Sequence, residues 1–427
     1  MTFSVHTKLR KMRSDFKLGN NPLFDELSIM ETSLVQNGVP ITWRKAKNFS
    51  VWDEKGNMWI DLTSGIFVAN AGHSNPRIKR AIKKQLDADL IYAYNYPTKV
   101  KRDFVKKLLS LAPKHLDTAL LLNSGSEDMD LAYKLIKFYA ERTEKKYIVT
   151  FRGAYHGRGL SNDLISGSPE KANWSGVRDE NVVFLDFPDK NDAKFDPSKL
   201  PCPKEIAGFV VETFQGWSAQ FYPDGFISDL CAFAKQHGAL VCFDEMQSGF
   251  YRLGPIFGYM TYGSEIEPDI VCLGKGISSS LPISAVLTRS SIANLKEKAD
   301  LHSTHSGNAL CCAAALANIK FLSDSREVAR RKETEEIFGN QMKRLNHGGI
   351  VKKVNWRGLI GALIFENAEV ASLVARGCIK KGVLLLSTSR GSIKIAPPLT
   401  ITQEAITEAI TVIEECIKEV HGEVCRE

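Results

Sequence analysis

Lys275 and Asp244 are the two side chains whose types and placement could do chemistry. Lys275 follows a short apolar run and has a glycine on each side, and Asp244 follows a second such run upstream. Runs of this kind are typical of buried strands, and ligands of open α/β sheets bind at the carboxyl ends of the strands. A partly buried lysine can act as a nucleophilic amine, and a buried aspartate can keep a pyridine nitrogen protonated. The pair therefore predicts a site for pyridoxal 5′-phosphate.

Residues 123–127 follow another expected strand and offer groups that could bind a phosphate. Ser124, Gly125 and Ser126 bring hydroxyl and backbone N–H groups to an expected helix start, where anions bind well. A serine followed three residues later by a glutamate is also a common helix cap, which needs no ligand. We predict that the three residues bind the cofactor, and the cap remains the alternative.

An aromatic pair and an acid follow two further expected strands. Tyr155 and His156 lie in a turn with glycines on either side, where a planar cofactor could stack on the tyrosine ring. Plain packing would also explain such a pair. Glu212 precedes Gln215 and Gly216 and could hold the site or close a turn. We predict Tyr155 and His156 as cofactor contacts and Glu212 as a supporting residue.

The residues after Asp244 extend the expected contacts with the cofactor. Met246 could pack against the cofactor ring, and Gln247 could donate a hydrogen bond to its phenolic oxygen. An Asp-Glu pair at a strand end could instead bind magnesium in a nucleotide hydrolase. The chain has no G-x-x-x-x-G-K-[ST] loop, which disfavours that alternative.

A cluster of hydroxyls and imidazoles occupies residues 302–308, before an apolar helix expected at 309–322. His302 and His305 suggest zinc, but no carboxylate or thiol completes the ligand set, so we predict no metal site. Thr304 is expected to donate its hydroxyl to a phosphate.

The order of apolar segments indicates the fold class. Between about residues 60 and 290, short β-branched runs alternate with helical segments, which predicts an α/β fold with a mostly parallel sheet. The later part reads as a smaller α+β domain. At 427 residues the chain exceeds the size of one hydrophobic core. We expect a large domain at 56–322 and a small domain at 323–427, to which residues 1–55 contribute. The strands expected in the sheet are 119–122, 147–151, 182–185, 208–211, 239–243 and 270–273.

Composition and charge exclude several function classes. The net charge of +7 is mild for this length and the basic residues are spread out, so we predict no nucleic-acid partner. The nine cysteines show no C-x-x-C spacing, which favours a reducing compartment. No signal peptide or membrane span is recognisable, and the expected localisation is cytoplasmic.

Taken together, these motifs resemble the class III aminotransferases, which belong to fold type I of the pyridoxal-phosphate enzymes. The resemblance implies a seven-stranded sheet in the large domain, Lys275 as the Schiff-base lysine and proton shuttle, and Asp244 at the pyridine nitrogen. It also implies a homodimer with shared active sites, in which Thr304 reaches the phosphate bound by the neighbouring subunit. The motifs that carry the resemblance are residues 123–127, 155–157, 212–216, 244–249, 274–276 and 304–308.

Two residues depart from the family pattern. Trp217 stands where relatives specific for α-amino acids often have a glutamate, and Lys394 stands where they have an arginine. An indole offers a flat apolar wall or simply packs, and a lysine lacks the planar fork of arginine. We therefore predict an aminotransferase that moves an amino group from a small-molecule donor to an aldehyde or keto acceptor, with an ω-amine, amino-sugar or aminocyclitol substrate. An aminomutase or amino-acid racemase of the same family is the alternative. A non-catalytic scaffold would lack the lysine or the aspartate, and both are present.

Overall fold

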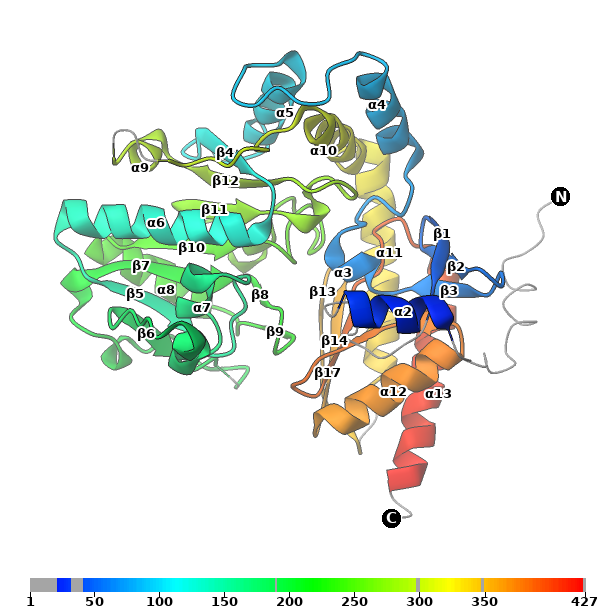
Figure 1. Ribbon diagram of the computed structural model, residues 1–427. Coiled ribbons are helices and arrows are strands. Elements are labelled where there is room, and N and C mark those ends of the chain that lie inside the picture. The colour runs from blue at the N-terminus through cyan, green and yellow to red at the C-terminus, as the bar shows by residue number, and fades with distance from the viewer. Residues whose placement is uncertain (1–20, 32–40, 189, 297–299, 347–348, 425–427) are drawn as a thin grey trace. The chain divides into compact units, whose positions relative to one another are not determined.

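The structure is a computed structural model that describes residues 21–31, 41–188, 190–296, 300–346 and 349–424 (Figure 1). The chain divides into two compact units. One extends from Pro76 to Glu327, and the other combines the residues up to Asn75 with those from Val328 onward. The domain assignment made from the sequence stays a prediction. No helix within the described ranges is long and apolar enough to cross a membrane.

The unit Pro76–Glu327 contains a seven-stranded sheet. Its strands are β4 (Thr118–Leu122), β5 (Tyr147–Phe151), β6 (Val182–Leu185), β7 (Ile206–Glu212), β10 (Leu240–Asp244), β11 (Ile270–Leu273) and β12 (Ser284–Thr288). They lie in the order β4-β12-β11-β10-β7-β5-β6. Only β12 runs antiparallel to its neighbours, β11 and β4. The mostly parallel sheet of fold type I that we expected is confirmed.

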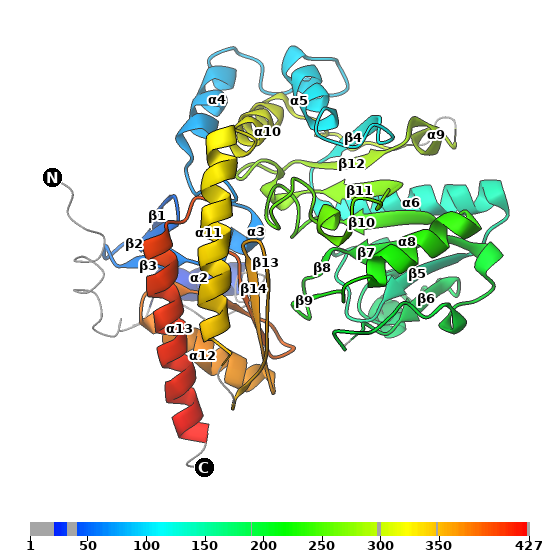
Figure 2. The same ribbon diagram turned by 180° about the vertical axis from the view of Figure 1, so that it is seen from behind.

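Helices cover both faces of this sheet. The helix α6 (Gly125–Thr143) lies across one face and α8 (Phe226–His237) lies across the other, as Figures 1 and 2 show from opposite sides. The central strands β7, β10 and β11 are buried along their whole length. Strands covered on both faces are apolar at successive positions, which explains why the sequence made them recognisable as short continuous runs.

Further helices of this unit pack beside the sheet. The helix α10 (Ala309–Leu322) contacts both α4 (Pro76–Leu86) and α5 (Lys99–Leu109). The short elements are α7 (Leu160–Leu164), η2 (Pro169–Ser175), η3 (Pro197–Lys199), η4 (Pro203–Glu205), β8 (Phe214–Gln215), β9 (Gln220–Phe221), η5 (Gly258–Tyr262), η6 (Lys275–Ile277) and α9 (Ser290–Ala293).

The other unit contains two four-stranded sheets. The strands of the first are β1 (Trp43–Lys47), β2 (Ser50–Asp53), β3 (Met58–Asp61) and β15 (Val383–Leu384), and those of the second are β13 (Val351–Arg357), β14 (Ile360–Phe365), β17 (Ser392–Ile395) and β16 (Leu386–Ser387). The helices are α2 (Pro22–Met30), α3 (Ser64–Phe67), α11 (Ser325–Arg344), which begins just before the division, α12 (Ala368–Lys380) and α13 (Gln403–Val424). The buried indole of Trp59 donates to the carbonyl of Ile379 at 2.9 Å and ties β3 to α12.

The short element α3 is a left-handed turn. Ser64, Gly65, Ile66 and Phe67 have φ angles of 52°, 57°, 64° and 67°. A β-branched residue such as Ile66 adopts this conformation only when its surroundings impose it. The hydroxyl of Ser64 donates to the carbonyl of Ala396 at 2.5 Å and helps to fix the turn.

Candidate active site

The expected site residues follow the carboxyl ends of parallel strands. Ser124 lies just beyond β4, Tyr155 follows β5, Glu212 ends β7, Asp244 ends β10 and Lys275 follows β11. Because these strands are parallel, their carboxyl ends lie at the same edge of the sheet. The structure therefore brings these predicted positions to one edge.

The carboxylate of Asp244 is buried and held at both oxygens. Its Oδ1 accepts the backbone N–H of Met246 at 3.0 Å, and its Oδ2 lies 2.9 Å from Nδ1 of His156. The imidazole of His156 is itself buried, and its backbone N–H donates to the hydroxyl of Ser166 at 2.9 Å. These two contacts fix the orientation of the Asp244 carboxylate.

Lys275 lies in a tight loop with a left-handed backbone. Its φ is 44°, which is uncommon for a residue with a side chain. The amide of the buried Asn318, on α10, donates to the carbonyls of Gly276 and Ile277 at 2.8 Å each and accepts from Ser279 at 2.7 Å. The loop that carries the lysine is thus held by a helix outside the sheet.

The electrostatic environment of Lys275 favours a reactive amine. Burial lowers the pKa of its ammonium, and the negative charges of Asp244 and Glu212 oppose that shift. A lysine with a lowered pKa is unprotonated, and therefore nucleophilic, in more of the molecules at neutral pH.

Glycines make room for two side chains that follow Asp244. A Cβ atom on Gly125 or Gly274 would lie 2.6 or 2.5 Å from the sulfur of Met246. A Cβ atom on Gly216 would lie 1.7 Å from Nε2 of Gln247. Met246 is therefore packed between the loops after β4 and β11, and Gln247 lies against the loop after β7.

The start of α6 contains the helix cap and is compatible with the predicted anion site at residues 123–127. Ser124 and Glu127 form a reciprocal capping box, so the cap is present. The hydroxyl of Ser126 accepts the backbone N–H of Arg158 at 3.0 Å. The first N–H groups of a helix have no partner within it, so those of Gly125 and Ser126 can still serve an anion.

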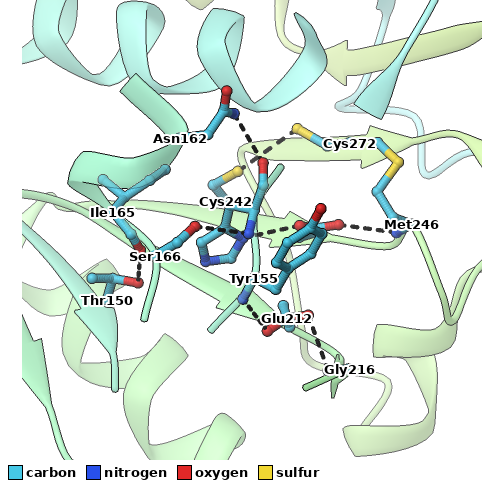
Figure 3. A network of polar contacts seen from close by, with 12 residues as sticks. Thr150, Tyr155, Asn162, Ile165, Ser166, Glu212, Gly216, Cys242, Met246 and Cys272 are labelled. Carbon is cyan, nitrogen blue, oxygen red and sulfur yellow. Dashed lines mark hydrogen bonds and ion pairs between the residues drawn. The ribbon is translucent and has the colours of Figure 1, made fainter. Parts of the chain in front are cut away.

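Glu212 connects two loops of the site, as Figure 3 shows. Its two oxygens accept the backbone N–H groups of Tyr155 and Gly216, each at 3.0 Å. Burial raises the pKa of Glu212 to about 7, a shift that His156 opposes and Asp244 reinforces. The carboxyl group therefore changes its charge near neutral pH while it holds both loops.

We expect kcat/KM to rise with pH through about 7, because Glu212 ionises there. The protonated carboxyl accepts the two N–H bonds as a neutral group, whereas the carboxylate accepts them as a charged and stronger acceptor. The loops of Tyr155 and Gly216 are thus held more firmly at higher pH. The measurement is a pH profile of the parent beside that of Glu212→Gln, whose amide does not titrate. The variant should lack this acid limb, and an identical limb in both profiles would contradict the assignment.

Comparisons with known proteins agree with this geometry. The family model for Aminotransferase class-III matches residues 33–417. A [LysW]-aminoadipate semialdehyde/glutamate semialdehyde transaminase from Sulfolobus acidocaldarius is 32% identical over 86% of this chain and 92% of its own length. An acetylornithine aminotransferase from Methanothermobacter thermautotrophicus is 31% identical over 92% of this chain and 96% of its own.

The chain belongs to the class III aminotransferases. A solved structure of the ornithine aminotransferase from Toxoplasma gondii, described with partial occupancy of pyridoxal phosphate, has the same fold. Its TM-score is 0.85 with 24% identity, over 98% of both chains. Class III aminotransferases are pyridoxal-phosphate enzymes, so this chain is a pyridoxal-phosphate-dependent transaminase.

The residues of this aminotransferase fit that cofactor. A carboxylate oriented by two bonds suits a pyridinium nitrogen, and an amine of lowered pKa suits an aldehyde. Three glycines lack the Cβ atoms that would collide with Met246 or Gln247, so the loops can lie close around the site. The start of α6 offers N–H donors to a phosphate.

The remaining predicted residues are Trp217, Thr304 and Lys394. Trp217 lies beside Tyr155, with ring centroids 6.1 Å apart at 86°. Thr304 is exposed, and its carbonyl accepts the hydroxyl of Tyr92 at 2.9 Å. Lys394 belongs to the other unit, where its buried side chain places Nζ 5.3 Å from the ring centroid of Phe67, in the left-handed turn. Thr304 and Lys394 therefore stay predictions as ligand contacts.

Sequence reasoning missed two neighbours of the site. Arg158 is exposed and donates from Nε to the hydroxyl of Tyr155 at 3.1 Å. Because Arg158 comes one residue after Gly157, the sequence could have indicated that it lies near the site. No feature of the sequence indicated Asn318, because it lies in an apolar helix far along the chain.

Proposed function

We propose that this aminotransferase transfers the amino group of a terminal amine to an aldehyde or keto acceptor, with Lys275 and Asp244 at the centre of the reaction. The observation that supports the proposal most is their placement after β11 and β10, within the class III family. Pyridoxal phosphate, when bound, supplies the electron sink that makes removal of a proton next to nitrogen feasible. Every other contribution to catalysis comes from residues of the chain.

The proposal gives each residue a role that its environment supports. Lys275 would hold the cofactor covalently and then carry the proton, because its amine is partly desolvated and its loop is fixed. Asp244 would keep the ring nitrogen protonated. His156 and the backbone of Met246 orient that carboxylate. Because these groups are ordered before the reaction, they need not rearrange during it, and the activation barrier is lower.

Further residues are assigned to binding the cofactor. Tyr155 would stack on the cofactor ring, and Glu212 holds the backbone of Tyr155. Gln247 would donate a hydrogen bond to the phenolic oxygen, and Met246 would pack against the ring. Ser124, Gly125 and Ser126 would bind the phosphate with N–H and hydroxyl groups.

The homodimer and the cytoplasmic localisation expected from the sequence belong to this proposal. Tyr92, Tyr94 and Tyr96 are exposed, and Tyr92 contacts the loop that carries Thr304. Neighbouring exposed aromatics are common at protein interfaces. A second copy covering them would bring Thr304 to the boundary between the subunits, where it could reach the neighbour's phosphate.

The choice of a terminal amine rests on two arguments. The relatives reported above are named for acetylornithine and for semialdehydes, and none of them for an amino sugar or a cyclitol. Trp217 and Lys394 separate this chain from the pattern of enzymes specific for α-amino acids. We therefore favour the ω-amine among the substrates considered. We also propose Trp217 and Lys394 as substrate contacts.

Half-reactions test this proposal directly. The holoenzyme is mixed with N-acetylornithine, ornithine, 2-aminoadipate or glucosamine, without any carbonyl acceptor, and the visible absorbance of the bound cofactor is followed. We expect a single turnover that bleaches this absorbance with N-acetylornithine or ornithine. Bleaching by 2-aminoadipate alone would refute the terminal amine. Continued conversion of the donor without an acceptor would favour the mutase or racemase.

A further inference from the structure

The indole of Trp217 is contacted by an aromatic ring and by a cation. Its ring lies edge to face with Tyr155, at a centroid distance of 6.1 Å. Nζ of Lys171 lies over the indole, 5.6 Å from its centroid. Cations over the face of tryptophan are attracted by the ring quadrupole, and more strongly when they are shielded from water.

Lys171 is held in this position by an ion pair. Nζ of Lys171 lies 3.1 Å from Oδ1 of Asp163, and the side chains are only 26% and 14% exposed. Asp163 also accepts the indole N–H of Trp174 at 2.9 Å. Asp163 belongs to α7 and Lys171 to η2, which are in contact with each other. The single segment between β5 and β6 therefore supplies both the cation and the acid that orients it.

The backbone beside Trp217 is fixed independently. The N–H of Gly216 donates to Glu212, which also holds the backbone of Tyr155. Glu212 thus holds the residue next to Trp217, and Lys171 and Tyr155 contact the indole ring itself. The charge of Lys171 is balanced by Asp163, so its arrangement suits a role in orienting the indole better than a role in binding an anion.

We infer that Lys171 is a positioning residue for substrate specificity. It fixes the indole of Trp217 beside Tyr155, and the fixed indole forms an apolar wall for the substrate. This inference rests on the proposed function, which places Tyr155 against the cofactor. Asp163 contributes by keeping the ammonium over the ring.

Kinetics of charge-removing and charge-keeping variants provide the first test, with N-acetylornithine as the amino donor. Lys171→Met keeps the length of the side chain and removes the charge, and we expect KM to rise roughly three- to tenfold while kcat changes by less than about twofold. Lys171→Arg keeps the cation and should restore most of the loss. In a Trp217→Leu background, Lys171→Met should have no further effect, because the partner of the cation is already gone.

Lys137→Met is the matched control. Nζ of Lys137 lies 5.8 Å from the ring centroid of Tyr133 and 2.9 Å from Asp179, so it combines the same two contacts elsewhere in the unit. It should leave KM unchanged. An equal rise in KM in this control, or an undiminished effect of Lys171→Met without Trp217, would overturn the inference.

Fluorescence separates this inference from the proposed function, because it needs no substrate. The signal of Trp217 is obtained as the difference between each protein and its Trp217→Phe variant. We expect the anisotropy of this signal to fall in Lys171→Met and to recover in Lys171→Arg. Unchanged anisotropy would refute the positioning role even if N-acetylornithine is a substrate. A fall in anisotropy would support it even if N-acetylornithine proves inert.

Discussion

Lys275→Ala is expected to abolish transamination and to leave a protein that still binds pyridoxal phosphate without a covalent bond. The proposed function makes this amine the group that attaches the cofactor and moves the proton, and a positioned acid or base alone contributes up to about 10⁴-fold. We therefore expect turnover to fall by about 10⁴-fold or more. The contacts of Asp244 and of the α6 start do not involve Lys275, so the cofactor should remain bound.

Borohydride reduction followed by peptide mass spectrometry detects the covalent bond between the lysine and the cofactor. The parent should carry the adduct on the peptide that contains residue 275, and the variant should carry none. Lys145→Ala is a suitable control, because burial also lowers the pKa of Lys145 but its ammonium donates to the carbonyls of Lys204 and His237. Turnover of Lys275→Ala near the parent rate would exclude the proposed role.

Asp244→Asn is expected to bind the cofactor and to slow transamination by about 10³-fold. An amide cannot stabilise a protonated ring nitrogen, and a full charge close to another in a poorly hydrated site is worth several kcal/mol. The variant keeps the size of the side chain, and its carbonyl can still accept the N–H of Met246. The loss should therefore appear in kcat and not in the folding of the protein.

Glu245→Gln is the natural comparison, because Glu245 is the next residue and is also buried. Its oxygens accept the backbone N–H groups of Gly258 and Tyr259 at 2.6 and 2.8 Å, away from Asp244. This change should lower the free energy of unfolding by about 1–3 kcal/mol and leave the rate per folded molecule close to the parent. Single-turnover rates, normalised to bound cofactor, distinguish the two variants. An Asp244→Asn rate as high as that of Glu245→Gln would contradict the role of Asp244.

The sheet was predictable because its strands are buried on both faces. Continuous apolar runs marked β5, β10 and β11 almost residue by residue. The sequence did not reveal β12, whose antiparallel course departs from the alternation of strands and helices. Nor did it show the left-handed turn at Ser64–Phe67, since only Gly65 there favours such a backbone.

The candidate site could be predicted only for residues whose place at the end of a strand determines where they lie in the fold. Lys275, Asp244 and Tyr155 lie at or shortly after the carboxyl ends of strands, so topology alone places them at one edge of the sheet. Ser124 shows the limit of a local pattern, because the helix cap and the predicted anion site use the same residues. Lys171 could not be found, because its contact with Trp217 depends on how η2 and the residues after β8 approach each other.

The support that Asn318 gives to the Lys275 loop makes the reactivity of the lysine depend on α10. A substitution that shifts this helix would weaken the two hydrogen bonds from Asn318 and loosen the backbone that carries Lys275. Changes in residues 309–322 are therefore expected to reach the lysine without altering any residue at the strand ends.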